Sequence, residues 1–273
     1  MKTNKIGFER WMLFSSTILI IHLVYRLVDS SKLIWVFPLD YANDISSYLA
    51  QLHFLKVCGF HNFCPYWYNG FITFKFSPPG WYFLTYPFYL IFGNVHAAAY
   101  FSIIGIFIGI FIAFYIFGKL AKLSRIKRIT FFALFIGNAS AIGNFIRLGR
   151  PHELLSWFFF TILFFILYYY KDKETDKKFY LTGIIYALII LSYHSTGVLA
   201  SFLWFGFLLT RKGIRGVIKT ILAPILGLLL SSFWLIPFIS GVFSDSAIPH
   251  LNQGTWIWVF AKNTLFIHLA VFI

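Results

Sequence analysis

The sequence is poor in charge, and the charge that it has is mostly of one sign. Only 12% of its 273 residues are charged, and nine acidic residues stand against 23 basic ones. It also contains no Walker loop and no GxGxxG, GxSxG or HExxH motif. The missing motifs leave nucleotide hydrolysis and proteolysis without support, and the scarcity of charge excludes a disordered chain or a soluble enzyme domain.

Apolar residues are abundant instead, at 59% of the chain, and 22% of the residues are aromatic. Several apolar runs approach the roughly 20 residues that a helix needs to cross a bilayer. We therefore predict an all-α, polytopic transmembrane helix bundle that forms one domain over residues 1–273. The expected spans, about eight in number, are 11–28, 96–117, 129–146, 153–170, 179–193, 196–210, 220–239 and 255–273.

The net charge of +14 is distributed as short basic clusters between the apolar runs. This is how cytoplasmic loops look under the positive-inside rule, so the charge indicates contact with anionic lipid headgroups, and we expect no nucleic-acid partner. The N-terminus is accordingly predicted to be cytoplasmic. The clusters are Lys2, Lys5 and Arg10; Lys119 to Arg128; Lys171 to Lys178; and Arg211 to Lys219.

The apolar stretch Trp81–Phe92 is too short to cross, because twelve helical residues cover only about 18 Å. We read it as a re-entrant or interfacial helix; the alternative is a break within 96–117. The first outer loop then covers about residues 29–95. With this topology most chemically reactive side chains share the outer side: Asp29, Asp40, Asp44, Arg147, Arg150, His152, Glu153, His194, Asp245 and His250.

Asp44 directly precedes a stripe formed by Ile45, Leu49 and Leu52, spaced as one face of a helix. The spacing predicts an amphipathic helix on the outer membrane surface. Asp44 then has two interpretations. It is either a helix N-cap, or a carboxylate at the membrane boundary that accepts a proton from a hydroxyl group or binds a divalent cation.

The following segment "GFHNFCPYWYNGF" is rich in turn-forming and aromatic residues, including Trp67. Such rings favour the membrane interface, and Trp67 is also a candidate for substrate binding. Cys58 and Cys64 lack the CxxC spacing of structural zinc sites, so a disulfide is the favoured interpretation.

The sequence "FIRLGRPHELLSW" joins two spans on the outer side. Arg147 and Arg150 suit a phosphate, because the planar guanidinium donates two hydrogen bonds together. Glu153 is either a catalytic acid or a carboxylate that favours a helix N-terminus. His152 and His194 are candidates for substrate binding, with an interfacial and an interhelical histidine as the respective alternatives.

These motifs, in this order, resemble the GT-C superfamily of membrane glycosyltransferases. The residues that carry the resemblance are Asp44, Leu55, Gly59, Pro65, Trp67, Gly70, Pro78-Pro79, "YLIFG" at 89–93, "GRPHELL", "LSYHSTG" and "SSFWLIP". The chain is most similar to the bacterial and archaeal group labelled YfhO-like or 6-pyruvoyl-tetrahydropterin synthase-related. The likeness covers nearly the whole chain, through loosely defined motifs.

The resemblance implies transfer of a sugar from a polyprenyl phosphate to a lipid, glycan or protein acceptor, outside the cytoplasm at the plasma membrane. The family's loop carboxylate corresponds to Asp44, with Asp40 as the second choice, and its second acid to Glu153. A divalent cation, Mg or Mn, bound at Asp44 is the one expected cofactor. The chain departs from the family at Tyr48, where many relatives have histidine, and we expect it to lack a C-terminal part.

Two other functions stay open at this point. A transporter or flippase of lipid-linked or small polar substrates would show polar groups at mid-depth and inverted repeats, and apart from Lys262 the spans are nearly free of charge. A non-catalytic assembly partner would require a second membrane subunit.

Overall fold

The structure is a computed structural model, and it describes residues 2–35, 44–67 and 69–244. The chain divides into two compact units, Met1–Leu235 and Ile236–Ile273, and the packing described below lies within the first. Apart from one short hairpin, the described residues that form regular structure are helical, which confirms the predicted all-α fold class.

The elements follow one another along the chain as a series of helices interrupted early by the hairpin. The helices are α1 (Lys2–Asp29), α2 (Lys32–Trp35), α3 (Ile45–Val57), α4 (Gly80–Phe92), α5 (Val95–Phe117), α6 (Arg125–Ile136), α7 (Ala139–Ile142), the π-helix η1 (Gly143–Arg147), α8 (Pro151–Tyr170), the 3-10 helix η2 (Lys177–Tyr180), α9 (Leu181–Ser192), α10 (His194–Leu209) and α11 (Ile214–Ser244). In the hairpin, β1 (Phe63–Cys64) pairs antiparallel with β2 (Phe71–Ile72).

Four helical segments are long and apolar enough to cross a membrane, which makes this an integral membrane protein. They are Gly7–Asp29, Val95–Phe117, Pro151–Tyr170 and Ile214–Val242. A fifth span results if Arg125–Ile136 and Ala139–Arg147, which meet at an angle of 51°, cross together.

The prediction of about eight spans is therefore wrong. The runs 179–193 and 196–210 become α9 and α10, with only 12 and 16 residues. Straight helices of these lengths cover about 18 and 24 Å, less than a hydrocarbon core of about 30 Å. The predicted span 255–273 lies outside the described residues.

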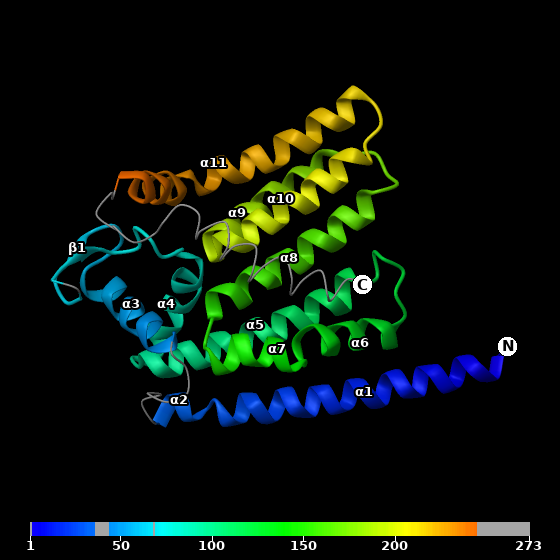
Figure 1. The fold of residues 1–273 in the computed structure, drawn as a ribbon, viewed down its shortest axis with the longest axis horizontal. Helices are drawn as coiled ribbons and strands as arrows, with labels where there is room; N and C mark the ends of the chain where they lie inside the picture. Colours follow the sequence, from blue (N-terminus) through cyan, green and yellow to red (C-terminus); the bar gives the residue numbers. More distant parts are fainter. Residues whose placement is uncertain (1, 36–43, 68, 245–273) are drawn as a thin grey trace. The chain divides into compact units, whose positions relative to one another are not determined.

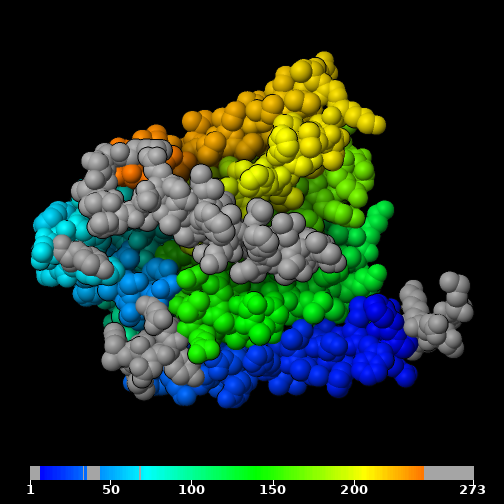
Figure 2. Space-filling view, in the orientation of Figure 1, coloured from blue at the N-terminus to red at the C-terminus, as the bar shows by residue number. Residues whose placement is uncertain are grey.

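Helix α1 presents most of its apolar surface outward. Only 11% of its span is buried, and Phe8, Trp11 and Ile21 are all more than half exposed. Figure 2 shows α1 uncovered along one edge of the visible face. Two hydrogen bonds link it to the bundle: Ser16 Oγ donates to Thr130 Oγ1 of α6 at 3.0 Å, and Tyr100 Oη of α5 donates to the carbonyl oxygen of Leu27 at 3.2 Å. An apolar surface of this length suits lipid as its solvent.

The helices that connect the two ends of the bundle alternate in direction. Helix α1 packs on α6, α5 on α8, α8 on α9 and α9 on α10. In Figure 1 the loop that carries α3 and β1 lies at one end of the helices, together with the turns before α8 and between α9 and α10. The basic connections before α6, after α8 and before α11 lie at the opposite end.

Helix α4 begins and ends on the side of α3 and does not run the length of the bundle (Figure 1). It has 13 residues and is not among the candidate spans, as the sequence predicted. Gly93 ends it with a φ of 64°, a conformation that glycine adopts without strain. Asn94 then caps α5 by accepting hydrogen bonds from the amides of His96 and Ala97, so the chain reverses direction within two residues.

The core next to the outer loop is largely aromatic. Trp81 and Tyr82 of α4 are fully buried, and Trp81 Nε1 donates to Ser102 Oγ of α5 at 3.2 Å. Trp234 of α11 is also fully buried and donates from Nε1 to the carbonyl oxygen of Phe74 at 2.9 Å. These contacts fix the loop, and with it α3, against the ends of the helices.

Candidate functional site

Asp44 and Arg150, 106 positions apart in the chain, form an ion pair. Arg150 Nε donates to Asp44 Oδ2 at 2.9 Å. Asp44 stands at the start of α3, but its side chain makes no capping hydrogen bond to that helix. The simple N-cap interpretation therefore does not describe this carboxylate, which is turned toward α8 instead.

Arg150 is the centre of the cluster. Its Nη1 donates to Asn144 Oδ1 at 3.1 Å, and the same nitrogen lies 4.0 Å from Glu153 Oε2. The other oxygen of Glu153, Oε1, accepts a hydrogen bond from Trp157 Nε1 at 3.4 Å. One guanidinium thus holds two carboxylates and an amide from three segments of the chain. We call Asp44, Asn144, Arg150 and Glu153 the outer cluster.

The local backbone explains how these groups meet. Asn144 belongs to the π-helix η1, in which Leu148 N donates to Gly143 O, one residue further back than in an α-helix. Gly149 then turns the chain with a φ of 66°. Arg150 is the last residue before α8, and the amide of Asp44 adds a 3.4 Å bond to Leu148 O.

The outer cluster is open to solvent. The side chains of Asp44 and Arg150 are 37% and 39% exposed, and that of Glu153 is 17% exposed. Neither Asp44 Oδ1 nor Arg150 Nη2 bonds to any residue that the structure describes. Arg147 is exposed as well and makes no ion pair within the described part of the chain. Reactive atoms of both signs are therefore accessible to a ligand.

His152, a predicted substrate-binding residue, is buried instead. It is 3% exposed, and its ring centre lies 4.4 Å from Tyr48, 4.6 Å from Tyr82 and 5.1 Å from Trp81. Neither ring nitrogen has a hydrogen-bond partner among the described residues. His152 therefore packs under Tyr48 as part of the aromatic core, and its contact with a substrate stays a prediction.

His194, another predicted substrate-binding residue, begins α10 and packs beside Tyr193, with ring centres 5.5 Å apart. The sequence analysis did not select Tyr193 as a candidate site residue. Burial raises the pKa of Tyr193, and the negative charges of Glu153 and Asp44 add to the rise while Arg150 opposes it. Tyr193 is therefore close to the outer cluster. The sequence offered one indication of Tyr193, which directly precedes the candidate His194 in the motif "LSYHSTG".

Tyr48 is a second functional candidate that the sequence analysis did not select. It follows Asp44 by one helical turn, and burial raises its pKa, with the charge of Asp44 as the next cause. The phenol therefore stays protonated and is a hydrogen-bond donor near the carboxylate. The sequence could have indicated Tyr48 through its spacing, because a residue four positions after Asp44 lies on the same face of a helix.

Trp67 lies in a separate aromatic group, with its ring centre 6.2 Å from Phe54 and 5.8 Å from Phe71. No ring contact between Trp67 and a residue of 147–153 exists in the described structure. Cys58 and Cys64 are bonded to each other, which confirms the favoured disulfide and removes both as metal ligands. Asp40, the second choice for the catalytic acid, lies outside the described residues.

The expected divalent cation at Asp44 stays a prediction, since Mg²⁺ is commonly held by one or two carboxylates together with substrate phosphates. The described residues contain no group of three or more His, Cys, Asp and Glu side chains that could share an ion. Asp44, the expected ligand, already gives one oxygen to Arg150, whose positive charge would repel a metal. We therefore assign no step to a metal ion.

Comparison with known proteins adds no relative. No protein-family model, curated protein or solved structure matches this chain. The interpretation of the outer cluster rests on its geometry and on the motifs quoted above.

Proposed function

We propose that the protein is an extracytoplasmic glycosyltransferase of the GT-C type in the plasma membrane, and that it takes a sugar from a polyprenyl-phosphate donor. The observation that carries the proposal is the outer cluster: an accessible carboxylate and an accessible guanidinium, joined at 2.9 Å. The cluster lies at the end of the bundle opposite the lysine-rich loops (Figure 1). That end is extracytoplasmic if the basic loops follow the positive-inside rule.

The proposed reaction uses the two charges for different tasks. Asp44 accepts the proton of the acceptor hydroxyl through its open oxygen, Oδ1. The acceptor oxygen then bonds to the anomeric carbon while the bond from that carbon to the phosphate oxygen breaks. The electron pair leaves with the polyprenyl phosphate, and the guanidinium groups of Arg150 and Arg147 stabilise the charge that develops there.

Glu153 and Asn144 act on Arg150 rather than on the substrate. Glu153 is 4.0 Å from Nη1 and Asn144 accepts from the same nitrogen, so they hold the guanidinium plane in place. Nη2 is left as the donor for a phosphate oxygen. A fixed donor stabilises a leaving group better than a mobile one, because no reorganisation is needed during the reaction.

Aromatic side chains complete the site. Tyr48 and Tyr193 flank the cluster, and both keep their protons because burial raises the pKa of each phenol. Aromatic faces and hydroxyl donors are the groups that contact the two sides of a sugar ring. In the proposed site these tyrosines border the sugar, while Arg147 lies exposed for the phosphate.

The test is donor cleavage by the purified chain in liposomes. Polyprenyl monophosphate glycosides of several hexoses are supplied, and release of polyprenyl phosphate is measured, with water as the acceptor if none is added. Asp44→Asn should reduce release at least a hundredfold, as expected for loss of a general base. Asp172→Asn is the matched control, since that carboxylate is 83% exposed in the loop after α8.

Two results would contradict the proposal. One is equal release by the Asp44→Asn variant and the wild type, with both proteins inserted and folded. The other is movement of intact glycolipid across the bilayer without cleavage, which would make the protein a flippase.

A further inference from the structure

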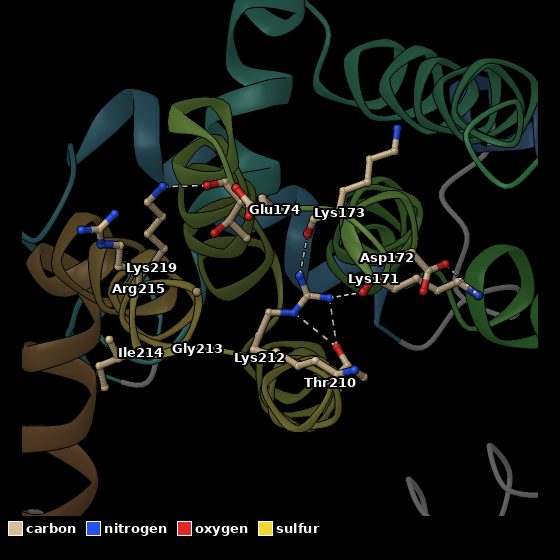
Figure 3. A pocket seen from close by; sticks show the side chains of 13 residues that line it. Lys171, Asp172, Lys173, Glu174, Thr210, Lys212, Gly213, Ile214, Arg215 and Lys219 are labelled. Carbon is tan, nitrogen blue, oxygen red and sulfur yellow. Dashed lines mark hydrogen bonds and ion pairs between the residues drawn. The ribbon is translucent and has the colours of Figure 1, made fainter.

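A second charged site lies at the other end of the bundle and is independent of the proposed function. A groove of about 920 Å³ opens between the loop after α8 and the segment that joins α10 to α11 (Figure 3). Six basic and two acidic side chains line it, a net formal charge of +4. The charged lining residues are Lys171, Asp172, Lys173, Glu174, Arg211, Lys212, Arg215 and Lys219. We call this the basic groove.

Neutral groups hold the two inner cations in place. Arg211 Nη1 donates to Lys173 O at 2.9 Å and its Nη2 donates to Lys171 O. Lys219 Nζ donates to Thr175 O at 2.7 Å. Figure 3 shows the side chain of Lys219 reaching across the groove to the loop after α8. Because carbonyl oxygens carry no net charge, these contacts fix the cations without neutralising them.

Aromatic rings support three of the basic side chains. Lys171 Nζ lies 4.4 Å from the ring centre of Tyr168, and Lys173 Nζ lies 3.5 Å from that of Tyr169. The guanidinium carbon of Arg211 lies 4.1 Å from the ring centre of Phe207. Such contacts restrict long side chains while leaving their charge intact.

The two acids compensate little of this charge. Asp172 is 3.9 Å from Lys171 Nζ and 83% exposed, so water screens the pair. Glu174 forms no ion pair with the described residues. Burial lowers the pKa of Arg211, and Asp172 only partly opposes this effect. The basic groove is thus a fixed site with excess positive charge.

The position of the groove favours a lipid as the source of the anion. It lies where the apolar helices α8 and α10 end and α11 begins. The ends of helices of spanning length, such as α8 and α11, are expected to reach the headgroup layer. Ile214 in the lining of the groove, and Leu209 next to the lining residue Thr210, are each 72% exposed and suited to acyl chains. Its volume is within the range of about 300–1,000 Å³ that small-molecule sites occupy.

We propose that the basic groove binds the phosphate headgroup of an anionic phospholipid from the leaflet next to the basic loops. The phosphate would lie among the cations, with the acyl chains along α10 and α11. The side chains of Lys212 and Arg215 make no hydrogen bond or ion pair to any described residue, so their charges are available to the phosphate.

The test measures binding of phosphatidylglycerol to the purified full chain by native mass spectrometry, with phosphatidylcholine as the zwitterionic comparison. The double variant Lys212→Gln/Arg215→Gln should fold normally, because it breaks none of the groove's internal bonds. Two lost charge contacts predict about a thirtyfold weaker affinity for phosphatidylglycerol. The matched control is Lys119→Gln/Lys122→Gln, which removes two charges from another basic loop outside the groove.

The outcomes separate a site from a general attraction. Little change in the control, with a large loss in the groove variant and no preference for the zwitterionic lipid, supports the proposal. Equal losses in both variants would overturn it, because diffuse charge would then explain the binding. Displacement of the lipid by an equal concentration of inorganic phosphate would also overturn it, because the groove would then be a site for soluble anions.

Discussion

Substitutions in the ion pair between Asp44 and Arg150 should change the free energy of unfolding little and the reaction rate strongly. Both side chains are more than one third exposed, at 37% and 39%. Pairs in such a setting contribute about 0.2–1 kcal/mol to stability, because water screens their attraction. Asp44→Asn keeps an oxygen that can accept from Arg150 Nε. We therefore expect its free energy of unfolding to fall by at most about 1 kcal/mol.

The predicted effect on the reaction is much larger. Loss of a general base lowers the rate by about 10²- to 10⁴-fold, or roughly 3–5 kcal/mol of activation free energy. Arg150→Gln should cause a loss of similar size through the phosphate. The double variant should be no slower than the slower single variant, because groups that act as one unit are not additive.

The assay is a double-mutant cycle with two readouts on the same four proteins. Thermal unfolding in detergent gives the stability coupling, and release of polyprenyl phosphate gives the rate. Destabilisation by 3 kcal/mol or more with a proportionate loss of activity would refute the reasoning, since the pair would then be a structural link. Fully additive losses of rate would equally refute the joint role.

Three further predictions concern packing. Gly183→Ala should destabilise the protein by about 1–3 kcal/mol, because the new Cβ collides with the backbone of α11. Gly206→Ala is the control: its Cβ has free space, and it should be neutral or stabilising by up to about 1 kcal/mol. Equal melting temperatures of the two variants would disprove this. Ser16→Ala should weaken the contact between α1 and α6 by about 0.5–2 kcal/mol, since Thr130 loses its buried partner, and unchanged resistance to denaturing detergent would contradict it. His152→Phe should raise the melting temperature, because it removes two buried nitrogens that have no hydrogen-bond partner among the described residues, and a lower melting temperature would contradict this.

The sequence predicted the helical class and the sharing of one end by Asp44, Arg150 and Glu153, because apolar runs and basic loops are properties of single segments. The number of spans could not be read in the same way. The runs that became α9 and α10 are apolar enough for a membrane, but where each helix begins and ends depends on turns such as Tyr193. The apolar composition of these runs therefore predicted two spans, whereas α9 and α10 are shorter than a helix that crosses a bilayer.

The contacts inside the site were out of reach for a different reason. The pairing of Asp44 with Arg150 requires the π-helical turn at 143–147 and the positive φ of Gly149, and neither has a strong local signal. His152 was selected because it is polar, yet tertiary packing buried it among aromatic rings. Tyr193 was passed over because its proximity to Glu153 exists only in the folded chain.

The brevity of α4 has a consequence for the rest of the molecule. Its 13 residues are too few to cross a bilayer, so the chain stays on one side of the membrane before α5. The side on which every later loop lies therefore depends on the short length of α4. About seven more apolar residues would bring it to spanning length. Such an insertion would invert the membrane orientation of α5 and all later helices. The lysine-rich loops would then lie on the opposite face of the membrane, and a lipid bilayer would separate residue 150 from residue 44.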